Sequence, residues 1–344
     1  MGGAPRGRHA SFAERGAHMK TATLKYSSAD GKTAIRALVW EPDAAEQLEG
    51  SENSEGLRCS DVRGIVQIVH GMSEHVERYA HFAKFLVKSG FVVCANDHVG
   101  HGKSVSGKQD LGHMPARNGA EVLVQDVHAL RGIMQARFGS EVPYVMFGHS
   151  MGSFITRKYV AEYGEALAAA VLCGTGQQAA ALSMAGNALA NALVRLRGEH
   201  HKSELLHSMA DGAYSKAVKN PRTDFDWLST DPAQVDAYIA DSECGQVFTV
   251  GGYATLTSLT GEVVRAESAS KVLKALPMLF IAGGQDPVGD CGRGVQKAAE
   301  EYKSAGVQSV DVKLYPGMRH EILNEPGRVR VMADVEAWFA KQGI

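Results

Sequence analysis

This sequence lacks several features that mark specialised classes of protein. Its 344 residues include 36 Lys+Arg and 38 Asp+Glu, so the formal net charge is −2 and no basic excess indicates nucleic acid as a partner. No apolar stretch approaches the roughly 18 residues that a transmembrane helix needs, so we expect no stable membrane anchor. The five cysteines are widely spaced, form no CxxC pair and are odd in number, which indicates reduced thiols in a cytoplasmic protein.

Two segments lack the apolar residues that a folded core requires. Residues 1–20 are polar and basic and contain no apolar stretch of a secretory signal, and Arg6 stands where a myristoylation site needs Ser or Thr. We expect this segment to lie outside the fold, either disordered or left over from expression. Residues 43–61 are rich in Glu, Ser and Gly, which predicts a solvated, mobile loop.

The rest of the chain alternates between strand and helix patterns. Residues 21–26 and 33–40 flank an Asp30-Gly31 turn and predict a hairpin. Six short apolar runs follow, as expected for strands buried on both faces of a parallel sheet: residues 64–69, 91–95, 144–147, 169–172, 278–281 and 310–315. Between them, apolar residues recur at helical spacing, as in Leu123, Val127, Leu130, Met134 and Phe138. The pattern predicts an α/β fold with a mostly parallel central sheet flanked by helices.

The alternation lapses over residues 176–276. Leucines there recur at helical steps, and we expect a helical cap inserted into a core formed by residues 21–175 and 277–344. These leucines are Leu182, Leu189, Leu193 and Leu196. The helix around residues 178–196 has two interpretations, an acyl-binding lid or a helix that only packs on the core. Its place over the carboxyl edge of the sheet favours the lid.

The most specific motif is Gly148-His149-Ser150-Met151-Gly152, which follows an apolar run and precedes a helical segment. Strand, tight turn and helix are the context of a nucleophile elbow, in which a strained turn raises a serine hydroxyl above the sheet. Side chains at positions 148 and 152 would collide with the neighbouring strand and helix. We predict that Ser150 is a catalytic nucleophile; a tight glycine turn without catalytic function is the simpler alternative.

A serine hydroxyl needs a base to become a nucleophile, and in this arrangement an acid and then a histidine follow the serine along the chain. Asp286 and His320 each come shortly after an apolar run, at the edge where open α/β sheets place their sites. We predict that His320 accepts the Ser150 proton and that Asp286 orients the imidazole. Asp290 is the alternative acid, and Asp286 before Pro287 could otherwise be a turn former.

The oxyanion that forms on an attacked carbonyl needs hydrogen-bond donors held in place. The backbone N–H of Met151, directly after the serine, is one predicted donor. The second is expected after the third strand. With the hairpin counted as two strands, that strand is residues 64–69, which leads into His70-Gly71-Met72. We predict the N–H of Met72 as the second donor, with Gly71 permitting a close approach.

Other patterns indicate no further site. Asp97, His98, His101 and His113 lack a recognised zinc spacing, so residues 96–102 are interpreted as a structured loop beside the site and not as a metal centre. The glycines of this region lack the Lys and Ser/Thr of a phosphate-binding loop. We therefore expect neither a metal nor an organic cofactor.

Together these residues resemble the α/β-hydrolase superfamily, and within it the monoacylglycerol lipase and lysophospholipase-like serine hydrolases. The resemblance spans about residues 21–342, and the passages that carry it are residues 70–75, 97–104, 148–152, 284–288 and 315–321. It implies Ser150, Asp286 and His320 as a triad, Met72 and Met151 as oxyanion donors, and a cap over an acyl pocket. The acidic loop at 43–61 departs from the family and lies away from the motifs.

We predict a cofactor-free carboxylic ester hydrolase that acts on small-molecule acyl esters, most directly monoacylglycerols or lysophospholipids, through an acyl-enzyme. Transient contact of the cap with a lipid surface is compatible with this activity. The same triad can also cleave amides, as an aminopeptidase does, or transfer the acyl group to an alcohol. A ligand receptor without catalysis is the alternative from another class, and the sequence indicates no oligomeric state.

Overall fold

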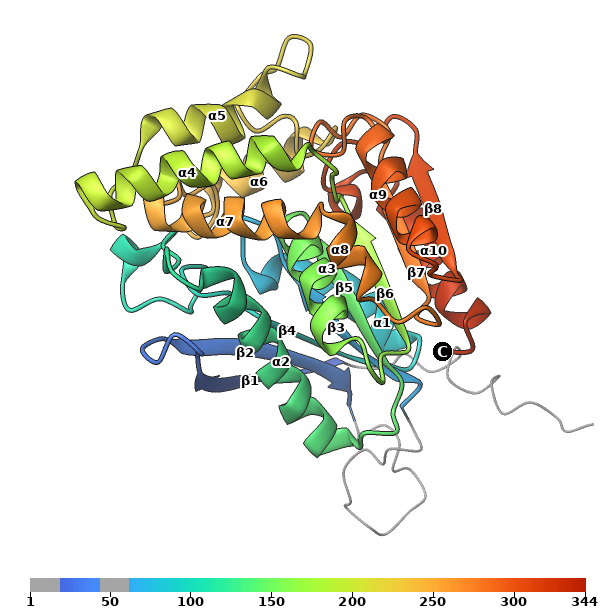
Figure 1. Cartoon of the computed structure of the whole chain (residues 1–344). Coiled ribbons are helices and arrows are strands. Elements are labelled where there is room, and N and C mark those ends of the chain that lie inside the picture. The colour runs from blue at the N-terminus through green and yellow to red at the C-terminus, as the bar shows by residue number, and fades with distance from the viewer. Residues whose placement is uncertain (1–18, 44–61) are drawn as a thin grey trace, which may run out of the picture.

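The computed structural model describes residues 19–43 and 62–344 (Figure 1). At one edge of its sheet, β1 (Met19–Ser27) pairs antiparallel with β2 (Ala34–Pro42). The predicted turn lies between them: Gly31 adopts a positive φ of 73°, and the Asp30 carboxylate accepts the backbone N–H of Thr33. The hairpin is confirmed, although β1 begins two residues earlier than the sequence pattern indicated.

All eight strands of the sheet were anticipated, and the predicted mostly parallel α/β architecture is confirmed. The strand order is β1-β2-β4-β3-β5-β6-β7-β8. Only the pairs β1/β2 and β2/β4 are antiparallel, and every other neighbouring pair is parallel. The strands after the hairpin are β3 (Gly64–Val69), β4 (Phe91–Asn96), β5 (Tyr144–His149), β6 (Ala169–Cys173), β7 (Met278–Gly283) and β8 (Val310–Tyr315).

Helices cover both faces of the sheet because the strands from β3 to β7 are apolar on both sides. Ile65 and Val69 of β3 pack toward α2 (Gly119–Phe138) and α3 (Met151–Tyr163). Val66 and Ile68 of the same strand belong to the opposite core, with apolar side chains of two other helices. These are α1 (Ala80–Lys88) and α10 (Arg328–Lys341), while α9 (Arg293–Ser304) packs near β7 and β8.

The last strand differs from the prediction. Residues 310–315 were expected to be buried on both faces, but all except Tyr315 in β8 are only partly buried. The reason is that β8 is an edge strand, paired on one side only, with β7. The polar residues Asp311 and Lys313, which interrupt its apolar run, fit that position.

Five helices separate β6 from β7, in the stretch predicted to be a cap. They are α4 (Ala180–Arg197), α5 (Glu204–Ser215), α6 (Pro232–Ala240), α7 (Val250–Val263) and α8 (Ala266–Ser270). Helices α4 to α7 gather at one end of the sheet, and α7 also contacts α2 and α3 (Figure 1). A division of the chain into core and cap at residues 176–276 therefore stays a prediction.

The leucines of α4 do not all pack as their spacing suggested. Leu182 is 65% exposed and Leu196 is 77% exposed, whereas Ser183 and Ala190 are buried. The two helices α4 and α7 approach through small residues: a Cβ on Gly186 would lie 3.2 Å from the Thr257 methyl group. Leu189 and Leu193 do pack, partly buried, against the core that includes α7, so only the part of the leucine face formed by Leu182 and Leu196 stays open.

Several predictions concern parts of the chain outside the described residues. These are residues 1–18 of the N-terminal segment, residues 44–61 of the acidic loop, and Cys59. In the described ranges, the four remaining cysteines are free thiols: Cys94, Cys173, Cys244 and Cys291. No helix within residues 19–43 and 62–344 combines the length and apolar character needed to cross a membrane.

Candidate active site

Ser150 occupies a strained turn between β5 and α3. Its φ of 52° and ψ of −121° are unusual for a residue with a side chain, and its backbone N–H donates to the carbonyl of Cys173 at the end of β6. The two motif glycines permit this turn. A Cβ on Gly152 would lie 1.9 Å from the Val69 carbonyl oxygen, and one on Gly148 would lie 2.3 Å from a threonine hydroxyl of α3. Only glycine fits at either position.

Asp286 and His320 meet although 34 residues separate them. They lie on the loops after β7 and β8, and Nδ1 of His320 is 3.0 Å from both carboxylate oxygens of Asp286. Asp286 is fully buried, and it also accepts the backbone N–H of Val288 at 2.9 Å. A carboxylate is an acceptor, so Nδ1 carries the ring proton and Nε2 is left as an acceptor. The alternative acid Asp290 pairs with Arg293 at the surface instead.

Gly174 makes room for the imidazole. This residue directly follows β6, has a φ of 61°, and a Cβ there would lie 3.1 Å from Cε1 of His320. The histidine therefore lies over the end of β6, between the strands that lead to Ser150 and to Asp286. Sequence analysis did not single out Gly174, because its role depends on a loop that comes more than a hundred residues later.

A cavity of about 260 Å³ joins the predicted residues. Ser150, His320, Met72 and Met151 all line it, and Asp286 lies outside the lining, against His320. The rest of its wall is mostly apolar and includes residues of α4, α5 and α7: Leu182, Leu206, Met209, Ala210 and Leu256. The structure thus brings the four lining residues together in the wall of one mostly apolar cavity.

The loop after β3 passes very close to Ser150. A Cβ on Gly71 would lie 3.1 Å from Cβ of Ser150 and 2.6 Å from a carboxylate oxygen of Glu74. The following residue, Met72, lines the cavity, and Ser73 has a positive φ of 53°. This proximity is the geometry that a backbone N–H at Met72 needs in order to reach a carbonyl bound beside Ser150.

One side of this loop is held by buried, neutral histidines. The Nδ1–H of His70 donates to the Gly71 carbonyl at 2.8 Å, and its Nε2 accepts the backbone N–H of His98 at 3.0 Å. Burial, and next to it the electrostatic effect of the neighbouring His101, lower the pKa of His70 to about 3. Burial also lowers the pKa of both His98 and His101. The loop interpreted from the sequence as structured therefore packs directly against His70.

The four residues considered as a metal set do not form one group. Asp97 is buried and pairs with Arg36 at 3.2 Å, and it accepts the backbone N–H of Val76. The rings of His98 and His101 lie 6.1 Å apart, edge to face, beside His70. His113 lies elsewhere, stacked on His200. The interpretation of residues 96–102 as a loop, and not a metal centre, agrees with this packing.

The other side of the loop is held by buried charges that the sequence analysis missed. The Arg78 guanidinium donates to both carboxylate oxygens of Glu321, at 2.6 and 2.7 Å, and to Glu74 at 2.8 Å. Glu74 also accepts the Tyr79 hydroxyl and the backbone N–H of Gly71, and it lies 3.2 Å from Nδ1 of His149. The available signal was their place in the sequence, because Glu321 directly follows His320 and Glu74 comes two residues after Met72.

These contacts set the protonation states of the network. Burial raises the pKa of Glu74, but the hydrogen bond from His149 and the charge of Arg78 outweigh it and hold the pKa well below its usual range. Burial lowers the pKa of His149, and the same Glu74 contact raises it above the ordinary value. Arg78 thus favours the charged carboxylates of both Glu74 and Glu321, and the contact between Glu74 and His149 favours the charged form of each partner.

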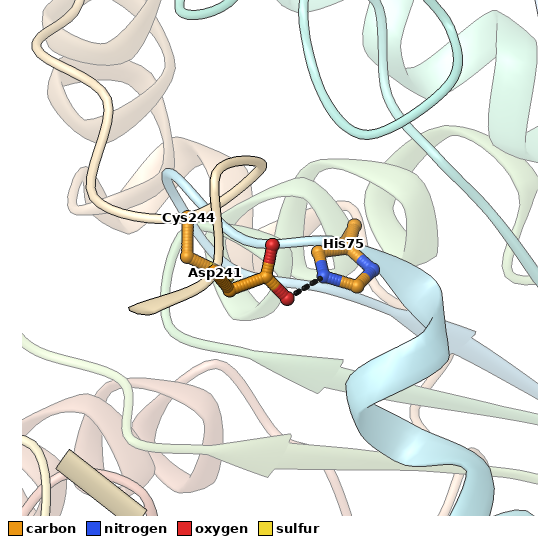
Figure 2. A group of neighbouring side chains, drawn as sticks. All are labelled: His75, Asp241 and Cys244. Carbon is orange, nitrogen blue, oxygen red and sulfur yellow. Dashed lines mark hydrogen bonds and ion pairs between the residues drawn. The ribbon is translucent and has the colours of Figure 1, made fainter. Parts of the chain in front are cut away.

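Residues between β6 and β7 contact both site loops. In Figure 2, Nε2 of His75 faces the Asp241 carboxylate, at a distance of 2.9 Å. Ser73 accepts the backbone N–H of Gly245 at 2.9 Å. On the other loop, the backbone N–H of Glu321 donates to a carbonyl of the segment that follows Trp227, and the Trp227 ring lies 5.1 Å from the His320 ring.

Comparisons with known proteins agree over most of the chain. The model of the serine aminopeptidase S33 family matches residues 60–327. A monoacylglycerol lipase of Mycolicibacterium smegmatis is 30% identical over 326 residues, which cover 93% of this chain and 99% of that protein. The monoglyceride lipase of Mus musculus is 27% identical over 288 residues, covering 81% of this chain and 82% of the relative.

Solved structures of an esterase and a lipase are also similar to this chain. A thermostable carboxyl esterase from Bacillus coagulans, in complex with glycerol, superposes with a TM-score of 0.84 at 30% identity, over 94% of this chain and 99% of that one. A lipase in its open form superposes with a TM-score of 0.79 at 26% identity, over the same shares of the two chains. Proteins described as lipases and esterases therefore match nearly the whole described fold.

Proposed function

Because the chain belongs to the serine aminopeptidase S33 family of α/β-hydrolases, we propose that it hydrolyses monoacylglycerols, or similar single-chain acyl esters, with Ser150 as the nucleophile. It is a carboxylic ester hydrolase, as its lipase and esterase relatives indicate. The observation that carries the assignment of residues is the buried Asp286–His320 pair beside a cavity that Ser150 also lines.

In the proposed reaction, Nε2 of His320 accepts the Ser150 proton while Oγ attacks the ester carbonyl. Asp286 keeps the ring proton on Nδ1 and stabilises the imidazolium that forms. The backbone N–H groups of Met72 and Met151 stabilise the oxyanion. The imidazolium then gives its proton to the departing alcohol, which leaves an acyl group on Ser150. A water molecule, deprotonated by His320, releases the fatty acid and restores the serine.

The cavity favours a neutral head group over a phosphate-bearing one. Among the described residues that line it there is no Lys or Arg, so a phosphate would find no ammonium or guanidinium partner, and the His149 ring in the wall is already in contact with Glu74. Its mostly apolar wall suits one acyl chain. Monoacylglycerols are therefore favoured over lysophospholipids within the proposed class.

An aminopeptidase activity is the second candidate, because the matching family is described as serine aminopeptidase S33. Such an enzyme needs a free carboxylate to hold the substrate's ammonium group. Glu74 and Glu321 do line the cavity, but Arg78 binds both, and His149 binds Glu74 as well. Neither carboxylate is left for an ammonium group, so the geometry favours esters.

The test combines a variant with a substrate panel. Ser150→Ala should lower kcat by at least about 10⁴-fold and abolish labelling by a fluorophosphonate probe, because the nucleophile is lost. Ser270→Ala, at an exposed position, is the control and should change neither. The panel comprises a monoacylglycerol, a lysophosphatidylcholine, a nitrophenyl ester and an aminoacyl amide. Full turnover by Ser150→Ala, or faster cleavage of the amide than of the monoacylglycerol, would contradict the proposal.

A further inference from the structure

Three side chains outside the candidate active site converge at one point of the surface. His113 belongs to the loop between β4 and α2, whereas Glu199 and His200 belong to the turn between α4 and α5. One ligand atom from each of the three lies within 4.8 Å of the others. The imidazoles of His113 and His200 are stacked, with ring centres 3.8 Å apart and planes 17° from parallel. Segments distant in sequence thus place two nitrogens and a carboxylate together.

The cluster is supported by a surrounding set of hydrogen bonds. Nδ1 of His113 lies 3.0 Å from the Thr249 hydroxyl, which leaves Nε2 as the coordinating atom. One carboxylate oxygen of Glu199 accepts the backbone N–H of Ala116 at 3.1 Å, and its backbone carbonyl accepts Gly251 at 2.9 Å. Partners of this kind orient ligands in metal sites, since they fix the ring tautomer and the carboxylate rotamer.

We propose that His113, Glu199 and His200 bind a divalent transition-metal ion, with Zn²⁺ as the representative, and that water completes the coordination. Imidazole nitrogen and carboxylate oxygen are ligands that Zn²⁺ takes at about 2.0–2.2 Å, which places neighbouring ligand atoms about 3.4 Å apart. Because the three ligand atoms already lie within 4.8 Å of one another, side-chain movements that shorten their separations by about 1.4 Å at most would bring them to that spacing. A polar cavity of about 540 Å³, lined by all three residues and by Asp110, gives a water ligand room.

A second cluster, shown in Figure 2, fits a metal less well. Its members are His75, Asp241 and Cys244. Nε2 of His75 is already bound to Asp241, and the other ring nitrogen points away from the cysteine (Figure 2). The Cys244 thiol packs among the aromatic side chains of Trp227 and Tyr238, and burial raises its pKa. An ordinary hydrogen bond and apolar packing account for these three residues.

The proposed ion would link the α4–α5 turn to the loop that carries His113. Helices α4 and α5 both contribute to the wall of the candidate active-site cavity. The turn is already attached to α7, because the carbonyl of His201 accepts the backbone N–H of Val250. An ion at this position adds to the existing hydrogen bond between Ala116 and Glu199 and links the turn more firmly to the His113 loop, so its binding should stabilise the whole folded chain.

Titration of the metal-free, full-length protein with ZnCl₂ in a calorimeter tests the proposal. We expect one equivalent to bind, and a rise in Tm of about 4 °C at a free concentration a hundred times Kd. Glu199→Gln and His200→Ala should each weaken binding by about 100-fold or more, because each removes a ligand. His201→Ala is the matched control, since this neighbour is exposed and outside the cluster, and it should bind as the parent does.

Three results would overturn the proposal. The first is no zinc binding by the parent protein, and the second is parental affinity in His200→Ala. The third is that Cys244→Ser no longer binds zinc while His200→Ala still does. That result would assign the ion to the cluster of Figure 2. Unfolding curves recorded in EDTA show whether each variant is folded, so a loss of affinity cannot arise from a loss of structure. Because the readout is binding, the result is independent of the proposed esterase activity.

Discussion

The two sides of the candidate active-site cavity are built differently. On the side of the central sheet, Asp286, Glu74 and Glu321 are buried, and each is paired with a specific partner. On the side of α4 and α5, the wall is apolar, and residues such as Leu182 and Met209 remain more than half exposed. Bond-making needs atoms held to within tenths of an ångström, whereas an acyl chain needs only apolar area and the right shape. The first side should therefore be intolerant of substitution and the second tolerant.

The largest effect is expected from Asp286→Asn. The amide cannot hold the ring proton on Nδ1 of His320, so the imidazole loses the tautomer that accepts a proton from Ser150. We expect kcat to fall by about 10⁴-fold with little change in KM, measured with a short nitrophenyl ester. Asp290→Asn, four residues further along at the surface, should retain parental kcat. Equal losses in the two variants would remove the reason for preferring Asp286.

Glu321→Gln should have the next largest effect, on stability. Burial raises the pKa of Glu321, but its contact with Arg78 outweighs burial and lowers the pKa below the ordinary value. The contribution of the carboxylate is therefore present above about pH 4.5 and is lost as the pH falls through the lowered pKa. At pH 7 the variant should lose about 3–5 kcal/mol of unfolding free energy, because Arg78 loses its bidentate partner.

Urea unfolding at pH 7 and at pH 3.5 measures this difference. The difference in unfolding free energy between Glu321→Gln and the parent should be smaller at pH 3.5, because the unfolded parent chain takes up a proton on Glu321 below about pH 4.5 while the folded chain resists it. Glu300→Gln is the control, since its carboxylate is exposed at the surface, and it should change stability by less than about 0.5 kcal/mol. If the difference in unfolding free energy between Glu321→Gln and the parent were the same at both pH values, the charge of Glu321 would not be what stabilises the fold.

A pair of glycine variants compares backbone tolerance on the two sides. Gly152→Ala should destabilise the fold by about 3 kcal/mol, because the new Cβ would lie 1.9 Å from the Val69 carbonyl. Gly212→Ala, in α5, meets no atom closer than 3.8 Å and should stabilise the helix by about 0.5–1 kcal/mol. Urea unfolding of both variants checks the prediction. Similar losses in the two would show that the α5 side is packed as strictly as the sheet side.

The smallest effect is a change of preference among substrates. Ala210→Phe places a large ring in the part of the wall that α5 contributes. Long-chain monoacylglycerols should then lose at least about 10-fold in kcat/KM relative to short-chain ones, since the cavity becomes shorter. Leu205→Phe, on the exposed part of the same helix, should leave the ratio unchanged. A shift of the same size in both variants would indicate a general disturbance of α5.

Prediction from the sequence succeeded where a local pattern dictates the structure. The hairpin turn at Asp30-Gly31, the strands and the helix that carries Leu123 and Val127 follow from spacing and turn chemistry alone. The mostly parallel sheet flanked by helices followed as well, because strands that alternate with helices are typical of parallel pairing, whereas the strand order came only from the structure. The strained turn at Ser150 was anticipated from Gly148 and Gly152. In the structure, a Cβ at either position would collide with neighbouring atoms.

Other features depend on contacts between distant segments. The edge position of β8 could not be read from residues 310–315, since it depends on how many strands pair beyond it. The network of Glu74, Arg78 and Glu321 joins residues 243 positions apart, and no local pattern distinguishes its members from surface charges. The exposure of Leu182 likewise depends on which face of α4 packs against α7, and this cannot be known before the two helices are placed together.

The sequence by itself determined the order of strands and helices and the glycines that the tight turn at Ser150 requires, because these depend on the sterics of neighbouring residues. The order of the motifs also predicted the pair of His320 and Asp286. Only the tertiary structure decided that His149 lies against the buried Glu74 and that Arg78 already binds Glu74 and Glu321. It also decided which side chains line the cavity. The physical reason is that the burial and the pairing of a side chain depend on contacts between helices, strands and loops that are distant in sequence. These contacts form only when the chain folds.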